Sequence, residues 1–444
     1  MTLLVISPDY ASHLFPLLTL ASAWQKAGER VVVATGSATA GIVEASGFER
    51  VDLRLGRGSN PGTIKAEEQP TGEDDALRGF FAATRRGMVE TLRFQAEARS
   101  DDLLWEPVET ARAVQRILDE VRPDQVIVDH LAFSARLALL ASGTRHADVV
   151  LGHPSALPVG DEVYGFPPAW PAAFEPEEDD LDELHALHAL CERVRDRFTA
   201  QWNDALAVLA PQLPPVRDAF ALAGDVLLLN YPEELHDPDR SELLPPHAFI
   251  GSAVRREAPD ADVQDWIDEG GDPIVYVSLG SFLSVRGDVL ARIAAALRDL
   301  DVRVALATGS TALDELGDLP SDWLVRPFLP QVTLLGHADL AVTHGGNNSV
   351  TEAATAGVPM LVLPLSTDQF AGAAALEDAG LGLALAPNVA TVTELRQAAK
   401  LLLNPSGGQR AMLDAVASSL SRSPGPQRAY QALAGGIRPE QAAR

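Results

Sequence analysis

The feature that most constrains the fold is an alternation of short apolar runs with helical patterns. The apolar run 3–6 is followed by a small polar turn and by apolar residues at helical spacing from Leu14 to Trp24, and further strands are predicted at 29–35 and 125–129. Buried strands that alternate with amphipathic helices form parallel sheets covered by helices on both faces. The first half of the chain therefore predicts a doubly wound α/β domain.

The same alternation restarts in the second half. Strands are predicted at 273–281, 302–306, 340–343 and 358–363, with a helix over 287–300. A second doubly wound domain of similar size is therefore expected, with a cleft between the two.

A segment rich in proline and charge separates the halves, as is usual for a linker, and a strand is predicted within it at 226–229. The expected division of the chain is an N-terminal Rossmann-like domain at 1–215, an interdomain linker at 216–250, a C-terminal Rossmann-like domain at 251–415 and a helical segment at 416–444 that packs back on the N-terminal domain.

The composition favours a large core and disfavours two classes of partner. The chain has 444 residues, 46% of them hydrophobic, and its formal net charge is −27. A field of that sign repels phosphate backbones and anionic lipids, so binding to nucleic acids or membranes is not expected. No stretch approaches the roughly 18–20 apolar residues of a membrane span, and the N-terminus lacks the basic region of a secretory signal. We therefore expect a cytoplasmic protein.

Neither thiol nor metal chemistry stands out. The single cysteine, Cys191, excludes an internal disulfide, and it shares a helical stripe with apolar residues that predicts a place in the core. Asp-x-Asp occurs four times in this acidic chain, which indicates chance rather than a catalytic metal. His185 and His188 lie one turn apart on a predicted helix at 179–209, where a solvated face is the favoured interpretation. No metal site is expected.

Two long segments, 55–76 and 152–178, lack a secondary-structure pattern. Loops this long inside a compact domain are usually functional or disordered. Aromatic residues in the second segment favour a wall for an apolar ligand, because small-molecule sites are lined mainly by apolar side chains. A surface loop held by its own side chains is the alternative. The aromatic residues are Tyr164, Phe166, Trp170 and Phe174.

A histidine and an acid are expected at the same edge of the first sheet. His13 follows the first strand, and Asp129 ends another strand of that sheet. Ligands of open parallel sheets bind at the carboxyl ends of the strands. A carboxylate that fixes the tautomer of a histidine and stabilises its imidazolium makes it a competent base near neutral pH. The pair is therefore a candidate general base with its partner, and a purely structural histidine is the alternative.

The segment 344–349 carries the most specific pattern of the second half. It reads His-Gly-Gly-Asn-Asn-Ser, follows a predicted strand and begins a predicted helix. The glycines let the backbone approach a ligand, Asn348 or Ser349 can cap the helix, and free amide groups and the helix dipole face an anion. A phosphate site is inferred, with His344 and backbone donors supplying the positive end. A simple tight turn is the alternative.

Taken together, these patterns resemble the family 1 inverting nucleotide-sugar-dependent glycosyltransferases, which glycosylate small molecules such as plant secondary metabolites and bacterial polyketides. The resemblance extends over essentially the whole chain through the segments 12–16, 128–129 and 276–281, and it is most specific over 328–369. The matching motifs there are Phe328-Leu329-Pro330-Gln331, Leu335-Gly336-His337, Thr343-His344-Gly345-Gly346-Asn347-Asn348-Ser349 with Glu352, Gly357-Val358-Pro359 with Pro364, and Asp368-Gln369.

The resemblance implies two facing Rossmann-like domains of the GT-B type, the first binding the acceptor and the second the nucleotide sugar. It implies that His13 deprotonates an acceptor hydroxyl and that Asp129 is its partner. No metal or cofactor is implied, because the nucleotide sugar is a co-substrate and neutral donors with a helix dipole stabilise its diphosphate. The implied donor-binding residues are Phe328 at the nucleobase, Gln331 and Glu352 at the ribose, Ser281, His344, Gly346, Asn348 and Ser349 around the diphosphate, and Asp368 and Gln369 at the sugar. The candidate acceptor-binding residues are Tyr164, Phe166, Trp170 and Phe174.

Three positions depart from the family pattern. Phe328 and Asn347 stand where plant members have Trp, and Gly345 replaces a Cys. These changes leave the sugar open, since many bacterial members use dTDP-deoxysugars. Retention of both Asp368 and Gln369 favours a hydroxyl-rich sugar such as glucose.

The leading hypothesis is an inverting transferase that moves a hexose, with UDP-glucose favoured, to a hydroxyl of an apolar natural product such as a polyketide or phenolic. The alternatives are a dTDP-deoxysugar-dependent antibiotic glycosyltransferase, a sugar-nucleotide epimerase or related hydrolase, and a catalytically silent auxiliary protein of a partner transferase. The aromatic segment 152–178 argues against the epimerase. The joint presence of His13 and Asp129 argues against the silent protein.

Overall fold

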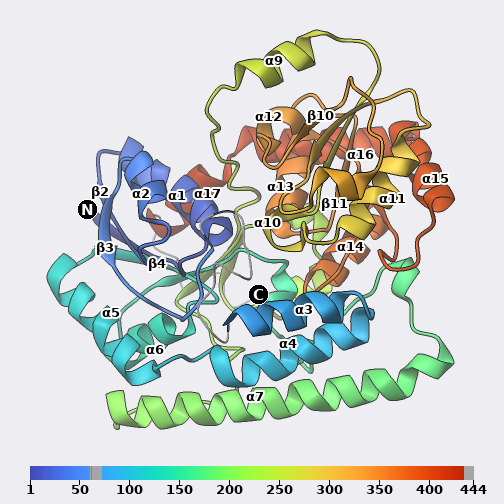
Figure 1. The fold of residues 1–444 in the computed structure, drawn as a ribbon. Coiled ribbons are helices and arrows are strands. Elements are labelled where there is room, and N and C mark those ends of the chain that lie inside the picture. The colour runs from blue at the N-terminus through green and yellow to red at the C-terminus, as the bar shows by residue number, and fades with distance from the viewer. Residues whose placement is uncertain (61, 63–72, 435–444) are drawn as a thin grey trace.

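Two parallel sheets organise the chain in the computed structural model, which describes residues 1–60, 62 and 73–434 (Figure 1). Within these residues, one sheet has the strand order β3-β2-β1-β4-β5-β6-β7 and the other has the order β10-β9-β8-β11-β12-β13. All the pairs of strands are parallel. The predicted pair of doubly wound α/β domains is therefore confirmed.

The inner strands of the first domain are buried along most of their length, as strands covered by helices on both faces must be, whereas the edge strands are partly exposed. Its strands are β1 (Thr2–Ile6), β2 (Arg30–Thr35), β3 (Glu49–Asp52), β4 (Gln125–Asp129), β5 (Ala147–Val150), β6 (Val226–Leu229) and β7 (His247–Phe249). Its helices are α1 (Ala11–Lys26), α2 (Ala40–Ala45), α3 (Glu73–Thr84), α4 (Met88–Asp102), α5 (Pro107–Val121), α6 (Phe133–Ser142), α7 (Leu181–Leu209) and α8 (Pro238–Ser241). Short 3₁₀ turns lie at η2 (Pro154–Ala156), η3 (Ala172–Phe174), η4 (Glu178–Asp180) and η5 (Glu233–Leu235).

The second domain has two apolar layers, one on each face of its sheet. In β8, Val275 and Val277 pack into one layer, while Ile274 and Tyr276 pack into the other, because successive side chains of a strand point to opposite faces. The strands are β8 (Ile274–Ser278), β9 (Arg303–Ala307), β10 (Leu324–Arg326), β11 (Leu340–Thr343), β12 (Met360–Val362) and β13 (Gly382–Ala384). The helical elements are α9 (Ala261–Asp268), α10 (Gly280–Leu283), α11 (Gly287–Leu297), η6 (Leu313–Leu316), α12 (Gln331–Leu335), α13 (Asn347–Ala356), α14 (Gln369–Asp378), α15 (Val392–Leu403) and α16 (Gly407–Arg422). The last helix of the described chain, α17 (Gly425–Ala434), follows α16.

The segment 216–250 differs from the expected linker. Its strands β6 and β7 extend the first sheet beyond β5, and the predicted strand at 226–229 is fully buried. The apolar run Val226–Leu229 loses contact with water by pairing with β5, which explains why this stretch belongs to a sheet although prolines and charges surround it. The chain crosses to the second domain only after β7.

The C-terminal segment returns to the first domain, where α17 lies beside α1 (Figure 1). The ring of Tyr430 packs edge-on against Trp24 at 5.1 Å between centroids, and its hydroxyl donates to Glu29 Oε1 at 2.9 Å. Residues 435–444 of the predicted segment lie outside the described residues. An aromatic contact with the buried Trp24 thus links the end of the described chain to its first helix.

Helices α3 and α4 lie under the second domain (Figure 1). Phe80 of α3 packs into the core of the second domain, and the Thr84 carbonyl accepts hydrogen bonds from Arg286 Nη1 at 3.0 Å and Asn388 Nδ2 at 2.9 Å. Helix α3 begins at Glu73, inside the segment 55–76 that was expected to be irregular, and residues 61 and 63–72 of that segment lie outside the described residues. These contacts join the two domains at one end of the cleft.

Both sheets reverse their strand order between two central strands, β1 and β4 in the first sheet and β8 and β11 in the second. The crevice at the carboxyl ends of such strands is the usual ligand site of open α/β sheets. His13 follows β1, Asp129 ends β4, Gly280 follows β8 and His344 follows β11. The topology therefore brings these residues from both domains to facing edges.

Candidate active site

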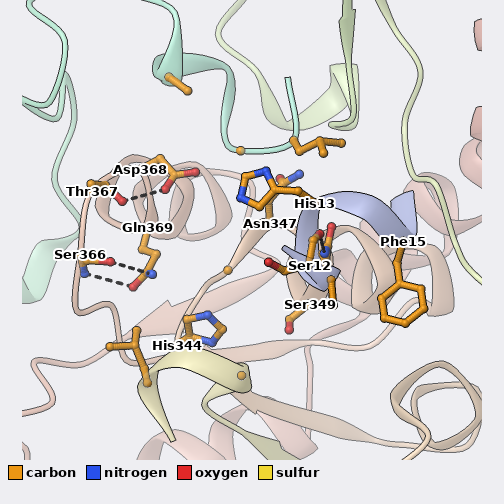
Figure 2. A pocket seen from close by; sticks show the side chains of 18 of the residues that line it. Ser12, His13, Phe15, His344, Asn347, Ser349, Ser366, Thr367, Asp368 and Gln369 are labelled. Atoms are coloured by element: carbon orange, nitrogen blue, oxygen red, sulfur yellow. Dashed lines mark hydrogen bonds between the residues drawn. The ribbon is translucent and has the colours of Figure 1, made fainter. Parts of the chain in front are cut away.

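A cavity of about 520 Å³ lies between the two domains. Figure 2 shows His13 beside it, with Asp368 and Gln369 on one side and Phe15 on the other. The structure brings most of the predicted site residues together here. Those that line the cavity are His13, Asp129, Tyr164, Phe166, Phe328, Gln331, His344, Gly346, Asn348, Ser349, Asp368 and Gln369.

His13 and Asp129 form a hydrogen-bonded pair. His13 Nδ1 lies 2.8 Å from Asp129 Oδ2, and the backbone amide of Leu131 donates to Asp129 Oδ1 at 2.8 Å. Because a carboxylate can only accept, the proton lies on Nδ1 and Nε2 keeps its lone pair. The side chain of Asp129 is 1% exposed and that of His13 is 25% exposed. The acid is therefore shielded from water, while the imidazole reaches the cavity.

The pair raises the basicity of the histidine. Burial lowers the pKa of His13, but the charge of Asp129, the hydrogen bond to it and the charge of Asp368 together outweigh burial, so the pKa lies above its ordinary value. The neighbouring His130 behaves in the opposite way, because burial and the charge of Arg136 lower its pKa to about 4. His13 is thus the histidine suited to accept a proton near neutral pH.

A proline in α1 creates a contact across the cleft. Pro16 has no N–H group, so the carbonyl of Ser12 lacks its helical partner four residues on. Asn348 Nδ2 donates to this carbonyl at 2.9 Å. The side chain of Asn348, predicted near the diphosphate, therefore also holds the two domains together.

His344 is closely surrounded by glycines. A Cβ atom at Gly280 would lie 2.6 Å from His344 Cε1, and one at Gly346 would lie 2.4 Å from His344 Nε2. Gly280 also has a φ of +72°, which favours glycine. His344 Nδ1 is buried without a hydrogen-bond partner among the described residues, and burial lowers the pKa of the ring to about 4. Burial therefore favours the neutral ring, whereas a positive end was expected at His344.

Helix α13 presents its N-terminus without a side-chain cap. It begins at Asn347, and Gly346 is the capping residue. The prediction that Asn348 or Ser349 caps the helix is wrong, because both residues lie within its first turn. Ser349 Oγ instead donates to Gln331 Oε1 at 3.3 Å. The first amide groups of the helix and its positive dipole end are the expected features of an anion site.

Glu352, predicted at the ribose, does not line the cavity. It lies behind two residues that do, Gln331 and Arg255. Gln331 Nε2 donates to one of its carboxylate oxygens, and Arg255 Nη1 donates to the other at 2.7 Å. Burial raises the pKa of Glu352, although Arg255 and the hydrogen bond from Gln331 act in the opposite direction. The carboxylate is thus enclosed by its partners, and Arg255 occupies the cavity wall in its place.

Asp368 connects the second domain to the segment 152–178. The backbone amide of His153 donates to Asp368 Oδ2 at 2.8 Å, and Thr367 Oγ1 donates to Oδ1 at 3.0 Å. Thr367 has a φ of +41°, which is strained for a β-branched residue. Strained backbone of this kind is often found at ligand sites, where surrounding contacts hold it in place.

Gln369 uses much of its side chain to hold the same loop (Figure 2). Its Oε1 accepts from the amides of Leu365 at 2.9 Å and Ser366 at 3.1 Å, and its Nε2 donates to Ser366 Oγ at 3.0 Å. One N–H of the amide is left for another partner.

The four candidate acceptor residues separate into two pairs. Tyr164 and Phe166 line the cavity. Trp170 and Phe174 instead pack against Phe370 of α14, with ring centroids 5.7 and 5.0 Å apart. Both rings are partly buried against the other domain and neither lines the cavity, so their predicted role at the acceptor stays a prediction.

The remaining predicted residues differ in how far the structure describes them. Phe328 is 70% exposed at the cavity, which leaves its ring free for stacking. The side chain of Ser281 lies outside the described part of the chain.

Sequence reasoning missed Arg255 and Ser12. Pro16 within a helical pattern was a usable signal for a free carbonyl at Ser12, whereas Arg255 lies in a segment without a pattern.

Among the described residues, no group of three or more His, Cys, Asp or Glu side chains is placed to hold a metal ion. Of the histidines on α7, His188 faces Glu192 at 3.9 Å and packs against the ring of Phe166.

In the part of the chain that the structure describes, none of the helices combines the length and apolarity that a membrane crossing requires.

Comparisons with solved structures match both domains together. A crystal structure of the glycotransferase of kitacinnamycin is 22% identical with a TM-score of 0.65, and the match covers 98% of this chain and 99% of that one. Spinosyn forosaminyltransferase SpnP is 19% identical with a TM-score of 0.66 and 98% coverage of both chains. Glycosyltransferase VinC in complex with dTDP is 20% identical with a TM-score of 0.65, covering 98% and 99%. These similarities establish the GT-B fold.

Curated relatives match over different lengths. Demethyllactenocin mycarosyltransferase of Streptomyces fradiae is 27% identical over 97% of this chain and 85% of its own length. The uncharacterized UDP-glucosyltransferase YojK of Bacillus subtilis is 27% identical over 42% of this chain, and the alignment spans 46% of that relative's length. Residues 186–414, half of the chain, match the family described as UDP-glucoronosyl and UDP-glucosyl transferase. The chain therefore belongs to this family, the family 1 glycosyltransferases that its sequence resembles.

Proposed function

We propose that the chain transfers a hexose from a nucleoside diphosphate sugar to a hydroxyl of an apolar natural product, with inversion at the anomeric carbon. The observation that carries the proposal is the His13–Asp129 pair, which lines the same cavity as the N-terminus of α13. A base and an anion-binding helix are the two groups that direct displacement of a diphosphate requires.

In the proposed reaction, His13 Nε2 takes the proton of the acceptor hydroxyl while its oxygen attacks the anomeric carbon. The bond from that carbon to the diphosphate oxygen breaks, and the nucleoside diphosphate leaves with the electron pair. Asp129 keeps the proton on Nδ1 and stabilises the imidazolium that forms. Attack from the face opposite the leaving group inverts the configuration.

The leaving diphosphate gains negative charge as the bond breaks. The N-terminus of α13 carries about half a unit of positive charge from its aligned peptides and has no side-chain cap to compete for its amides. We propose that these amides, with the neutral His344, stabilise the leaving group in a metal-independent reaction.

The acceptor is proposed to be an apolar small molecule. Tyr164 and Phe166 supply aromatic surface on the side of the cavity formed by the first domain. Relatives named as natural-product transferases, including an oleandomycin glycosyltransferase from Streptomyces antibioticus, support an acceptor of this class.

UDP-glucose is the favoured donor in this proposal, because Asp368 keeps lone pairs for sugar hydroxyls beyond its two bonds to the protein. A dTDP-deoxysugar is a second candidate. The observation in its favour is that Gln369 Oε1 already accepts two backbone hydrogen bonds, which reduces its capacity to bind hydroxyls.

The test is an assay with a panel of UDP- and dTDP-sugars and mixed aglycones, in which nucleoside diphosphate release and glycoside mass are both measured. We expect release that depends on the aglycone, an inverted anomeric configuration by NMR, and full activity in EDTA. Absence of aglycone-dependent release with every donor contradicts transfer. A retained configuration contradicts direct displacement, and activity abolished by EDTA and restored specifically by Mg²⁺ or Mn²⁺ contradicts a metal-independent anion site.

A further inference from the structure

The wall of the cavity contains one permanent positive charge. Among the described residues that line it, Arg255 is the single arginine or lysine, in a chain whose formal net charge is −27. A nucleoside diphosphate donor is itself an anion. This guanidinium is paired with the carboxylates of Glu257 and Glu352, so without it their negative charge would stand uncompensated beside an anionic ligand.

Arg255 is fixed in place from two sides. Its Nη1 donates to Glu352 Oε1 at 2.7 Å, and its Nη2 donates to Glu257 Oε1 at 3.0 Å. Its guanidinium also lies 5.8 Å from the ring centroid of Phe15, on the opposite domain. The Arg255 side chain is 19% exposed, whereas that of Glu352 is 4% exposed. The guanidinium thus covers the carboxylate and holds a defined position at the cavity.

Covering Glu352 changes the chemistry that a ribose would meet. A carboxylate oxygen accepts hydrogen bonds from the vicinal 2′- and 3′-hydroxyls of a ribose, so it favours a ribonucleotide over a deoxyribonucleotide. A guanidinium group can only donate hydrogen bonds. The oxygen of one ribose hydroxyl is sufficient to accept such a bond, so a guanidinium does not require the 2′-hydroxyl. Each oxygen of Glu352 accepts one hydrogen bond, from Arg255 or from Gln331, and the side chain is 4% exposed and does not line the cavity, so its remaining lone pairs are closed off from a ribose.

We propose that Arg255 is a specificity-determining residue of the donor site, which attracts the nucleotide by its charge and, by covering Glu352, makes the site indifferent to the 2′-hydroxyl. The proposal rests on the proposed function, since it concerns the nucleoside diphosphate of the same donor. It predicts that the wild-type chain accepts donors of both the UDP and the dTDP class, with the choice between them left to the base and the sugar.

The experiment compares UDP with 2′-deoxy-UDP by titration calorimetry, because the two ligands differ only in one hydroxyl. We expect the wild-type dissociation constants to agree within about threefold. Arg255→Ala should weaken both ligands about tenfold through loss of the charge, and it should make UDP about tenfold tighter than 2′-deoxy-UDP, since an oxygen of Glu352 becomes free to accept. The double variant Arg255→Ala/Glu352→Gln should lose this new preference.

Two further variants control the experiment. Arg326→Ala removes an arginine of the same domain that pairs with Asp260 and Asp262, and it should leave both dissociation constants unchanged. Glu352→Gln alone should leave the ratio of the two constants at its wild-type value, and this result decides the proposal if Arg255→Ala does not fold.

The outcomes distinguish a failure of the proposed role of Arg255 from a failure of the proposed function. A tenfold preference for UDP in the wild-type chain, or its loss in Glu352→Gln, overturns the role of Arg255 while leaving nucleotide binding in place. An unchanged ratio in folded Arg255→Ala overturns it as well. Failure of the wild-type chain to bind either ligand overturns the proposed function itself.

Discussion

Asn348 Nδ2 donates a 2.9 Å hydrogen bond to the carbonyl of Ser12, which lies in the other domain and which Pro16 leaves without a helical partner. A proline inside a helix costs stability because it removes a helical hydrogen bond. Here the carbonyl that loses its helical partner accepts a hydrogen bond from across the cleft instead. The bond joins the helix that carries His13 to the first turn of α13.

Pro16→Ala should therefore weaken the link between the domains. The new N–H at position 16 competes with Asn348 for the Ser12 carbonyl, so we expect kcat/KM to fall about 2- to 10-fold, the range of one neutral hydrogen bond. In a double-mutant cycle, Asn348→Ala should have a smaller effect in the Pro16→Ala background than in the wild type.

Pro107→Ala is the matched control, because Pro107 lies at the start of α5. The N–H that alanine introduces there has no helical carbonyl to bind. Strictly additive effects of Pro16→Ala and Asn348→Ala would contradict the link.

His13→Ala should remove transfer while leaving nucleotide binding nearly intact, because the base lies on the first domain and the anion-binding helix on the second. General-base catalysis contributes typically about 10²–10⁴-fold, so the loss should fall in kcat. Steady-state kinetics and UDP titration on the same preparation measure the two effects. Retention of most of the activity with an ordinary alcohol acceptor would refute the assignment of the base.

The pH dependence of kcat/KM should reveal the effect of Asp129 on the pKa of His13. The base must be neutral to accept a proton, so activity falls as the pH drops through the pKa of His13, which lies above its ordinary value. The acid limb of kcat/KM should therefore have its midpoint above about 6.5, the value for an unperturbed histidine. Asp129→Asn removes the charge that raises this pKa, so the limb should move to lower pH while the rate decreases. Asp52→Asn, at an exposed carboxylate of the same sheet, should leave the limb in place.

The strands were predictable from the sequence because both faces of a central parallel strand are buried, which makes the whole strand apolar. The runs at 340–343 and 226–229 are examples. His13 and Asp129 could be paired in advance for a related reason, since the carboxyl ends of neighbouring parallel strands meet at one edge.

The parts of the site that escaped prediction depend on contacts between distant residues. Arg255 pairs with Glu352 across 97 positions, and no local pattern marks such a pair. Trp170 and Phe174 are apolar in either role, and no local pattern indicates that they pack against Phe370 of the other domain.

Phe370 and Phe328 provide a contrast between packing and binding. Phe370 is 0% exposed in an apolar cluster that contains residues of both domains, and Phe328 is 70% exposed at the cavity. Phe370→Ala should destabilise the fold by about 3–5 kcal/mol and lower Tm. Phe328→Ala should change stability by less than about 0.5 kcal/mol, yet weaken UDP binding through lost stacking on the base. Thermal unfolding and UDP titration of both variants measure the contrast, and equal losses of Tm would contradict it.

Donor preference tests whether Asp368 binds sugar hydroxyls. Each of its carboxylate oxygens accepts one hydrogen bond from the protein, so of about four lone-pair positions two are left for the sugar. A deoxysugar that lacks a matching hydroxyl leaves a desolvated group unsatisfied, which costs about 1–3 kcal/mol or roughly 5- to 150-fold in specificity. We therefore expect UDP-glucose to exceed a dTDP-2,6-dideoxyhexose in kcat/KM on the same acceptor.

Asp368→Ala should remove much of that preference, because the remaining contact to a hydroxyl is the single free N–H of Gln369. Glu377→Ala is the control, since Glu377 binds the backbone of the segment 152–178 from the same helix without lining the cavity. If the control alters the preference as much as Asp368→Ala, the effect comes from the position of α14 and not from hydroxyl binding. A clear preference of the wild-type chain for the deoxysugar would mean that Asp368 and Gln369 serve only to hold their loop, and the glucose assignment would then be wrong.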